Sequence, residues 1–293
     1  MLDHGRFDYS PIIRRPPLRW PNNARVALWV IPNIEHFLFE GHGTPISPRS
    51  VGFTPDVLNY AWRDYAPRVG IWRLMELLDR HGIRATVALN SAVCQYNPAI
   101  IEEGVKRNWE WMGHGITNST PIPTLGSEDE EREVIQTVYT TIKQATGRAP
   151  EGWLGPGLSE TVHTPDLLAE VGFTYLCDWC NDDQPYPMRT KRGRLISVPY
   201  SIEINDISSI LTKAYTAAEF GQMIRDQFDV LYAEGARSGR VMAIALHPFI
   251  IGVPSRIKYL DQALTYILGH PDVWVTTGGE IAGWYRDHGL APA

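Results

Sequence analysis

Features that would direct this 293-residue chain to a membrane, a nucleic acid or an oxidising compartment are scarce in its sequence. It has three cysteines, and the Cys177-x-x-Cys180 pair lacks the second pair of a zinc knuckle, so we expect buried free thiols. No apolar run approaches the ~20 residues that cross a bilayer, and residues 1–20 lack the apolar core of a signal peptide. The net charge of −6, without a Lys/Arg cluster, argues against nucleic-acid or anionic-membrane partners. We expect a cytoplasmic protein with a small-molecule substrate, and the sequence leaves a homo-oligomer open.

Strand and helix patterns alternate along most of the chain, which predicts a parallel α/β architecture. No Gly-x-Gly-x-x-Gly follows the first strand, which argues against a dinucleotide-binding fold. We expect one barrel-like domain over 25–293, preceded by an irregular, proline-rich arm over 1–24, with a loop over 37–66 that forms a lid or wall of a site. The predicted strands are 25–31, 83–90, 109–114, 152–156, 173–178, 195–200, 241–246 and 273–276, and the predicted helices are 69–80, 98–108, 127–147, 164–171, 217–235, 256–268 and 279–287.

The most informative stretch surrounds His247. An apolar run, Val241 to Leu246, has the length and β-branched content of a strand buried on both faces. Pro248 has no N–H for a sheet ladder, so the strand must stop there and His247 lies at its end. Ser255 is expected to cap the helix that follows. A lone histidine in this place could simply hydrogen-bond to backbone, so its interpretation depends on the other strand ends.

Polar side chains follow several other predicted strands. Asn33, Glu35 and His36 follow the first strand, His114 and Asn118 the third, and Asp178, Asp182 and Asp183 the fifth. The carboxyl ends of parallel strands meet at one end of a barrel, so these side chains can face His247. A carboxylate and two imidazoles supply a base, an acid and an oxyanion donor. This set suits hydrolysis of an unactivated amide.

These motifs resemble those of the polysaccharide-deacetylase superfamily, in which strands end in an acidic pair, in His-x-x-x-His and in Leu-His. The corresponding segments here are Asn33-Ile-Glu35, His114-Gly-Ile-Thr-Asn118 and Leu246-His247. A closer resemblance, over most of the chain, is to the branch of purine-catabolism allantoinase and cyclic-imide hydrolases. It rests on Gly152-Trp-Leu-Gly-Pro-Gly-Leu-Ser-Glu160, Asp182-Asp-Gln-Pro-Tyr186, Glu203-Ile-Asn-Asp206, and Leu246-His-Pro248 with Gly252 and Arg256. The resemblance implies a single distorted (β/α) barrel of seven or eight strands.

The sequence departs from the superfamily pattern where deacetylases hold a divalent metal. Asn118 stands in place of the second ligand histidine, Asn33 in place of the catalytic-base aspartate, and Leu154 in place of an arginine. If a metal is bound, Glu35 and His114 are its ligands, which is one fewer than the usual three protein ligands of catalytic zinc. His36, His42 or Asp182 would complete such a site. We expect that no cofactor is required, and zinc or another divalent metal stays the alternative.

We therefore predict a hydrolase of carbon–nitrogen bonds other than peptide bonds, which opens a small cyclic amide such as a hydantoin or cyclic imide. Glu35 would activate water, His114 and backbone amides near Gly155–Gly157 would polarise the carbonyl, and His247 would protonate the leaving nitrogen. Asp178 or a neighbouring acid would hold the His247 tautomer. The alternatives are a metal-dependent N-deacetylase of an acetylated sugar and a non-catalytic metabolite-binding barrel. The predicted substrate-binding residues are Asn33, His36, Asn118, Trp153, Pro156, Asp178, Asp182 and Arg256.

Overall fold

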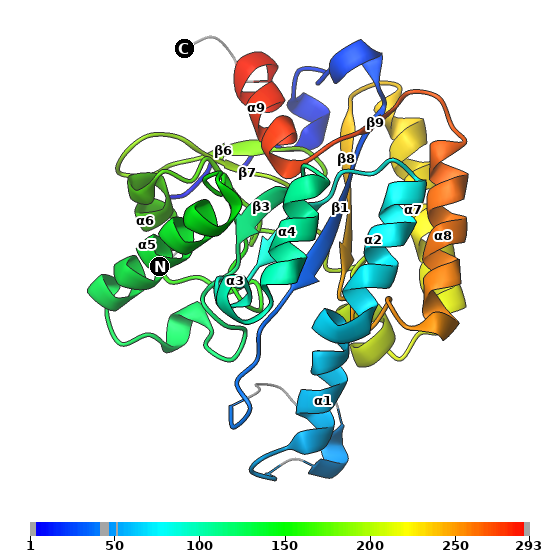
Figure 1. The fold of residues 1–293 in the computed structure, drawn as a ribbon. Helices are drawn as coiled ribbons and strands as arrows, with labels where there is room; N and C mark the ends of the chain where they lie inside the picture. Colours follow the sequence, from blue (N-terminus) through cyan, green and yellow to red (C-terminus); the bar gives the residue numbers. More distant parts are fainter. Residues whose placement is uncertain (1–3, 42–46, 51, 290–293) are drawn as a thin grey trace.

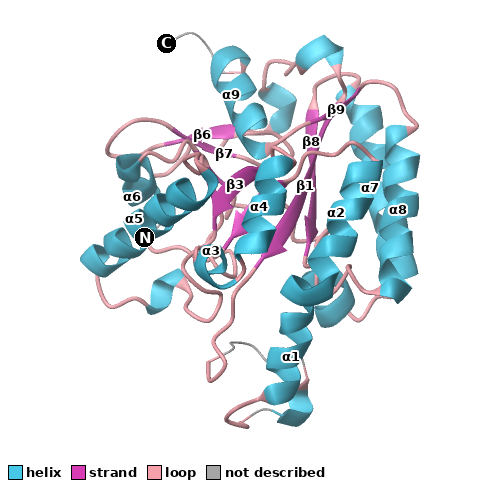
Figure 2. Ribbon diagram, in the orientation of Figure 1, coloured by secondary structure: helices cyan, strands magenta, loops and turns pink. Residues whose placement is uncertain are grey.

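A mixed, curled sheet with helices packed around it forms the chain in the computed structural model, which describes residues 4–41, 47–50 and 52–289 (Figures 1 and 2). The nine strands of the described part run in the order β6-β7-β5-β4-β3-β2-β1-β8, with β9 paired to β1. Because β6 and β8 are edges, the sheet is an incomplete barrel. This is the distorted barrel predicted from the sequence.

The strands alternate with helices as the sequence pattern predicts, apart from short additions. The strands are β1 (Val26–Ile34), β2 (Thr86–Leu89), β3 (Glu110–Gly113), β4 (Gly152–Trp153), β5 (Tyr175–Leu176), β6 (Tyr186–Met188), β7 (Leu195–Ser197), β8 (Arg240–Leu246) and β9 (Val273–Val275). The helices are α1 (Val57–Tyr65), α2 (Ile71–Arg80), α3 (Ala92–Tyr96), α4 (Pro98–Lys106), α5 (Glu128–Thr146), α6 (Thr164–Val171), α7 (Ala217–Gly235), α8 (Pro254–Leu268) and α9 (Gly278–His288).

The central strand β1 determines what faces the barrel interior. Side chains alternate between the faces of a strand, and Leu28 and Val30 of β1 pack in the layer beneath the helices. Trp29 and Ile31 lie in the second, interior core, and the Trp29 indole donates to the Pro199 carbonyl at 3.2 Å. Residue 33 continues this inward series. Glu35 follows directly after β1, whose carboxyl end points toward the side of the molecule where α1 lies (Figure 1).

Three local predictions from the sequence are wrong. Residues 37–66 are not only loop, because Asp56 accepts from the Asn59 N–H and caps helix α1. Ser255 does not cap α8, since the helix begins one residue earlier, with Val253 as its N-cap and Pro254 at its first turn. The short antiparallel strand β6 was not predicted, and its register pairs Tyr186 with Ser197 of β7.

The N-terminal arm, described from residue 4, is irregular apart from two short 3-10 turns and is held against the barrel by specific contacts. Trp20 is buried and its indole donates to the Arg240 carbonyl at 2.9 Å. Arg6 pairs with Asp166 at 3.0 Å, and Arg15 with Asp182 at 2.5 Å. All three cysteines are free, and no helix in the described part of the chain is long and apolar enough to cross a membrane.

Candidate active site

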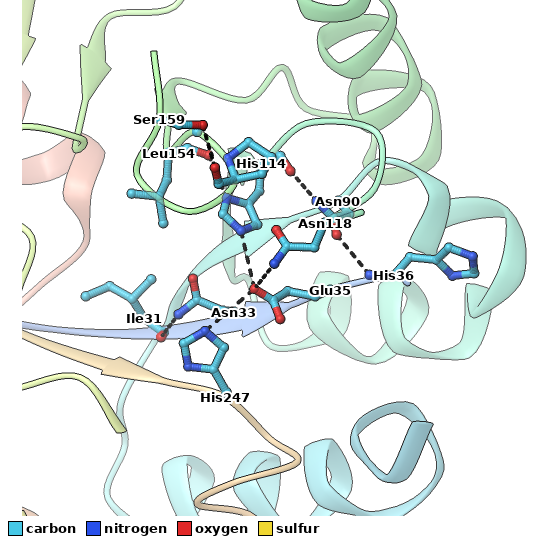
Figure 3. A network of polar contacts seen from close by, with 12 residues as sticks. Ile31, Asn33, Glu35, His36, Asn90, His114, Asn118, Leu154, Ser159 and His247 are labelled. Atoms are coloured by element: carbon cyan, nitrogen blue, oxygen red, sulfur yellow. Dashed lines mark hydrogen bonds and ion pairs between the residues drawn. The ribbon is translucent and has the colours of Figure 1, made fainter. Parts of the chain in front are cut away.

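Glu35 is the centre of a polar cluster at the carboxyl ends of β1, β3 and β8 (Figure 3). Its Oε1 lies 3.5 Å from Nε2 of His114 and 3.6 Å from Nε2 of His247. The Asn118 side-chain amide donates to the same oxygen at 2.9 Å. The two imidazole rings and the carboxylate are almost fully buried, and the structure thus brings together the three residues predicted to carry the chemistry.

His247 is held from behind by an acid that the sequence reasoning did not single out. Asp206 accepts from the His247 backbone N–H at 2.8 Å, and its Oδ1 lies 2.7 Å from Nδ1 of the ring. The bond fixes Nδ1 as the donor to Asp206 and directs Nε2 to Glu35. The prediction that Asp178 holds the His247 tautomer is therefore wrong.

Charges in this cluster are strongly coupled. Burial opposes ionisation of Glu35, but the positive charge of His247 and the hydrogen bond from its ring outweigh it and lower the pKa of Glu35 to about 2. Burial also opposes the His247 cation, whereas the carboxylates of Glu35 and Asp206 raise the His247 pKa to about 10. At neutral pH the site therefore holds a carboxylate beside an imidazolium, which is a base beside an acid.

His114 is oriented by backbone. Its Nδ1 lies 2.6 Å from the Leu154 carbonyl, and because a carbonyl oxygen only accepts, Nδ1 carries the hydrogen. Nε2 is then the ring atom that faces Glu35. Asn90, which directly follows β2, was missed by the sequence reasoning: its side chain donates to the His114 carbonyl and accepts from the His36 N–H at 2.9 Å. Its position at the end of an apolar strand was the available signal.

A small pocket of about 220 Å³ opens onto Glu35. Helix α1 contributes Tyr60 and Arg63 to its wall, so the segment 37–66 borders the site. His36 is stacked on Tyr96 with ring centroids 4.6 Å apart, and the Arg63 guanidinium lies 4.4 Å from the Phe37 ring centre. Flat aromatic surfaces and one cation therefore surround the entrance to a buried carboxylate.

Two of the predicted substrate-binding residues are instead buried and make contacts inside the barrel. Asn33 is buried, and its amide nitrogen lies 3.1 Å from the Tyr200 hydroxyl and 3.3 Å from the Leu246 carbonyl. Pro156 is buried in the loop after β4, against Gly115, where an added Cβ would lie 2.7 Å from the proline ring. Both residues shape the walls beside Glu35 and His114 without offering a free polar group.

Four other predicted contacts are placed elsewhere. Trp153 points to the helix layer, is fully buried and packs on Phe173. Asp182 pairs with Arg15 in a second cavity, of about 880 Å³. Arg256 donates to the Ile250 carbonyl at 3.2 Å. Trp153 thus belongs to the core on the helix side, whereas substrate binding by Asp182 and Arg256 stays a prediction.

Asp178, the fourth, accepts from the Gly155 N–H at 2.8 Å. Of the backbone amides near Gly155–Gly157 that were predicted to polarise the carbonyl, that of Gly155 is therefore already used by Asp178.

The donor set does not fit a catalytic zinc site. Glu35 and His114 are two strong donors, but Asn118 turns its N–H groups to Glu35, and His247 is held as a cation. His36 stacks on Tyr96, Asp182 pairs with Arg15, and His42 lies outside the described residues. Within the described residues no group of three His, Cys, Asp or Glu side chains is arranged to hold a metal ion. No catalytic step is therefore derived through a metal.

Comparison with known proteins finds a family match in the central region. Residues 58–176 match the family model of polysaccharide deacetylases. A candidate polysaccharide deacetylase of Schizosaccharomyces pombe is 28% identical over 302 residues, covering 92% of this chain and 93% of the relative. Peptidoglycan deacetylase of Helicobacter pylori is 25% identical over 250 residues, covering 74% and 84%. Both alignments extend well beyond residues 58–176 of this chain.

The fold comparison points to the branch predicted from the sequence. The crystal structure of PuuE allantoinase superposes with a TM-score of 0.82 and 27% identity, covering 96% of this chain and 98% of that one. The resemblance to polysaccharide deacetylases and their allantoinase relatives is thus confirmed, as is the (β/α)-barrel fold. The chain is a hydrolase of carbon–nitrogen bonds other than peptide bonds.

Proposed function

We propose that this chain, which carries a polysaccharide deacetylase domain, opens a small cyclic amide of the hydantoin or cyclic-imide type. The observation that carries the proposal is the Glu35 carboxylate, which lines a small pocket and lies against the His247 imidazolium. A base and an acid separated by 3.6 Å can act on the same amide bond, the base on the water that attacks the carbonyl carbon and the acid on the nitrogen. The pocket is smaller than the ~300–1,000 Å³ usual for ligand sites, which favours a compact ring over a polymer.

Glu35 is the base that accepts a proton from the attacking water. Its Oε2 is buried and has no hydrogen-bond partner among the described residues, so it can accept from a bound water. The water oxygen bonds to the ring carbonyl carbon and gives the tetrahedral intermediate. His114, whose unprotonated Nε2 faces Glu35, can accept a second hydrogen bond from the same water and orient it for attack.

His247 is the acid that completes the reaction. Its Nε2 proton passes to the ring nitrogen as the carbon–nitrogen bond breaks, which yields a carboxylic acid and, from an imide, an amide or, from a hydantoin, a ureido group. Asp206 keeps Nδ1 protonated throughout. Because the His247 charge depresses the pKa of Glu35, loss of that proton raises the basicity of Glu35, and the two proton transfers help each other.

A substrate panel tests the proposal against the two alternatives. Purified protein, with and without chelation, is incubated with hydantoin, allantoin, succinimide and glutarimide, and separately with chitin oligomers. Ring-opened product is quantified by chromatography and acetate by a coupled assay. We expect ring opening that Glu35→Gln abolishes. Release of acetate alone would replace the proposal by N-deacetylation, and calorimetric binding of an imide without turnover would indicate a non-catalytic barrel.

A further inference from the structure

One peptide group connects His114 to a buried acid that the mechanism above does not use. The Leu154 carbonyl accepts from Nδ1 of His114 at 2.6 Å, and the N–H of the next residue, Gly155, donates to Oδ1 of Asp178 at 2.8 Å. This C=O and N–H belong to the same planar peptide unit. Asp178, the peptide and the imidazole therefore form one continuous hydrogen-bonded chain that ends at Nε2, facing Glu35.

A second buried carboxyl group, that of Glu160 at the far end of the same loop, acts on Asp178. Oδ2 of Asp178 and Oε1 of Glu160 are both buried without a hydrogen-bond partner among the described residues, and the other Glu160 oxygen accepts from the Trp179 indole at 3.2 Å. Burial and the Glu160 charge raise the pKa of Asp178 well above its usual range, which favours its protonated form. The loop over residues 155–160 thus begins at a backbone amide held by Asp178 and ends at a carboxyl group that acts on the same side chain.

The loop between these ends is tightly constrained. A Cβ at Gly155 would lie 2.2 Å from the Ser159 carbonyl oxygen, so the turn accepts glycine there. The Leu158 N–H donates to the Gly155 carbonyl at 2.8 Å, and the Ser159 hydroxyl donates to the Pro156 carbonyl at 2.6 Å. The Leu154–Gly155 peptide consequently has few orientations, and its alignment depends on what holds its N–H.

We propose that Asp178 is a positioning residue for His114, acting through the Leu154–Gly155 peptide to fix the ring with Nδ1 protonated and Nε2 directed at Glu35. The inference rests on the proposed function, because the orientation of His114 affects turnover only if His114 takes part in the reaction. Hydrogen bonds in a chain polarise one another, and a peptide whose N–H is bonded to a carboxyl group is a stronger acceptor at its oxygen. Asp178 thereby orients His114 through an intervening peptide, whereas Asp206 orients His247 by direct contact.

The test compares Asp178→Ala with Asp178→Asn. Asparagine can still accept from the Gly155 N–H, as the aspartic acid does, whereas alanine cannot. Asp183→Ala, in the exposed turn that follows, is the matched control. Two readouts are used: ring ¹⁵N shifts of His114, assigned by the signal lost in His114→Gln, and kcat and KM for ring opening.

We expect wild type, Asp178→Asn and the control to show His114 protonated at Nδ1. Asp178→Ala should lose this single tautomer and lower kcat by about 10–100-fold, the usual effect of removing an orienting partner, with KM nearly unchanged. If Asp178→Ala does not fold, Asp178→Ser, which is too short to reach Gly155, carries the same expectation. An unchanged tautomer and kcat in the folded Ala or Ser variant, or loss of both in Asp178→Asn, would overturn the proposal. The ¹⁵N readout does not need turnover, so it separates failure of the relay from failure of the proposed function.

Discussion

Asp206→Asn isolates the charge that keeps His247 protonated. The asparagine oxygen can still accept from Nδ1 of His247, so ring orientation is kept while the negative charge 2.7 Å from the ring is lost. Desolvation lowers the pKa of His247, and Glu35 and Asp206 together raise it from 6.5 to about 10. An opposite charge at this distance typically shifts a pKa by about 1–3 units, so removal of the Asp206 charge should bring the His247 pKa to roughly 8.

The assay is the pH dependence of kcat/KM with a cyclic amide that has no titrating N–H. The acid must be protonated to act, so the alkaline limb reports the His247 pKa. Wild-type activity should persist to about pH 10, whereas Asp206→Asn at pH 9 should fall to roughly a tenth of its value at pH 7. Asp183→Asn is the control and should follow wild type. An alkaline limb that does not move in Asp206→Asn would show that His247 is not the proton donor.

Three further outcomes are expected. His247→Ala should fold and lower kcat by ~10²–10⁴-fold, and His247→Gln should restore substrate binding without restoring turnover; a stable Ala variant with wild-type kcat would exclude the residue. Trp153→Ala should lower unfolding free energy by about 3–5 kcal/mol in denaturant titration and leave KM unchanged, and a selective rise in KM would return this residue to the substrate site. The melting temperature should be highest between pH 4.5 and 6.5. The raised His247 pKa gives stability that is lost as pH rises from 6.5 to about 10, and the lowered Glu35 pKa gives stability that is lost as pH falls from 4.5 to about 2. In His247→Gln, the melting temperature should fall less steeply on the alkaline side.

Elements with strong terminal signals could be predicted from the sequence. Helices α6 and α7 have the predicted bounds, because Pro165 occupies the first turn of α6 and Thr216 and Glu219 form a capping box at α7. Glu35, His114 and His247 could be placed together because each lies at the carboxyl end of a parallel strand, where chemistry collects in barrels.

The acid that holds His247 could not be predicted in the same way. Asp206 precedes a short π-helical segment, Ile207–Thr212, and reaches the site because the neighbouring Asn205 forms an isolated bridge to Ala245 of β8. The hydrophobic periodicity of the sequence does not indicate such a contact. Trp153 was misplaced for a different reason: a strand of two residues is too short to show which side chain faces outward.

The most direct test of the central claim is ring opening by Glu35→Gln. Glutamine keeps the shape of the side chain but cannot take a proton from water, so the ring-opening rate of the chelator-treated protein should fall by ~10²–10⁴-fold. Reaction of the wild type in ¹⁸O-labelled water should place one label in the product carboxyl group. A Gln variant that opens the ring at the wild-type rate would contradict the assignment of Glu35 as the base and, with it, this account of the site.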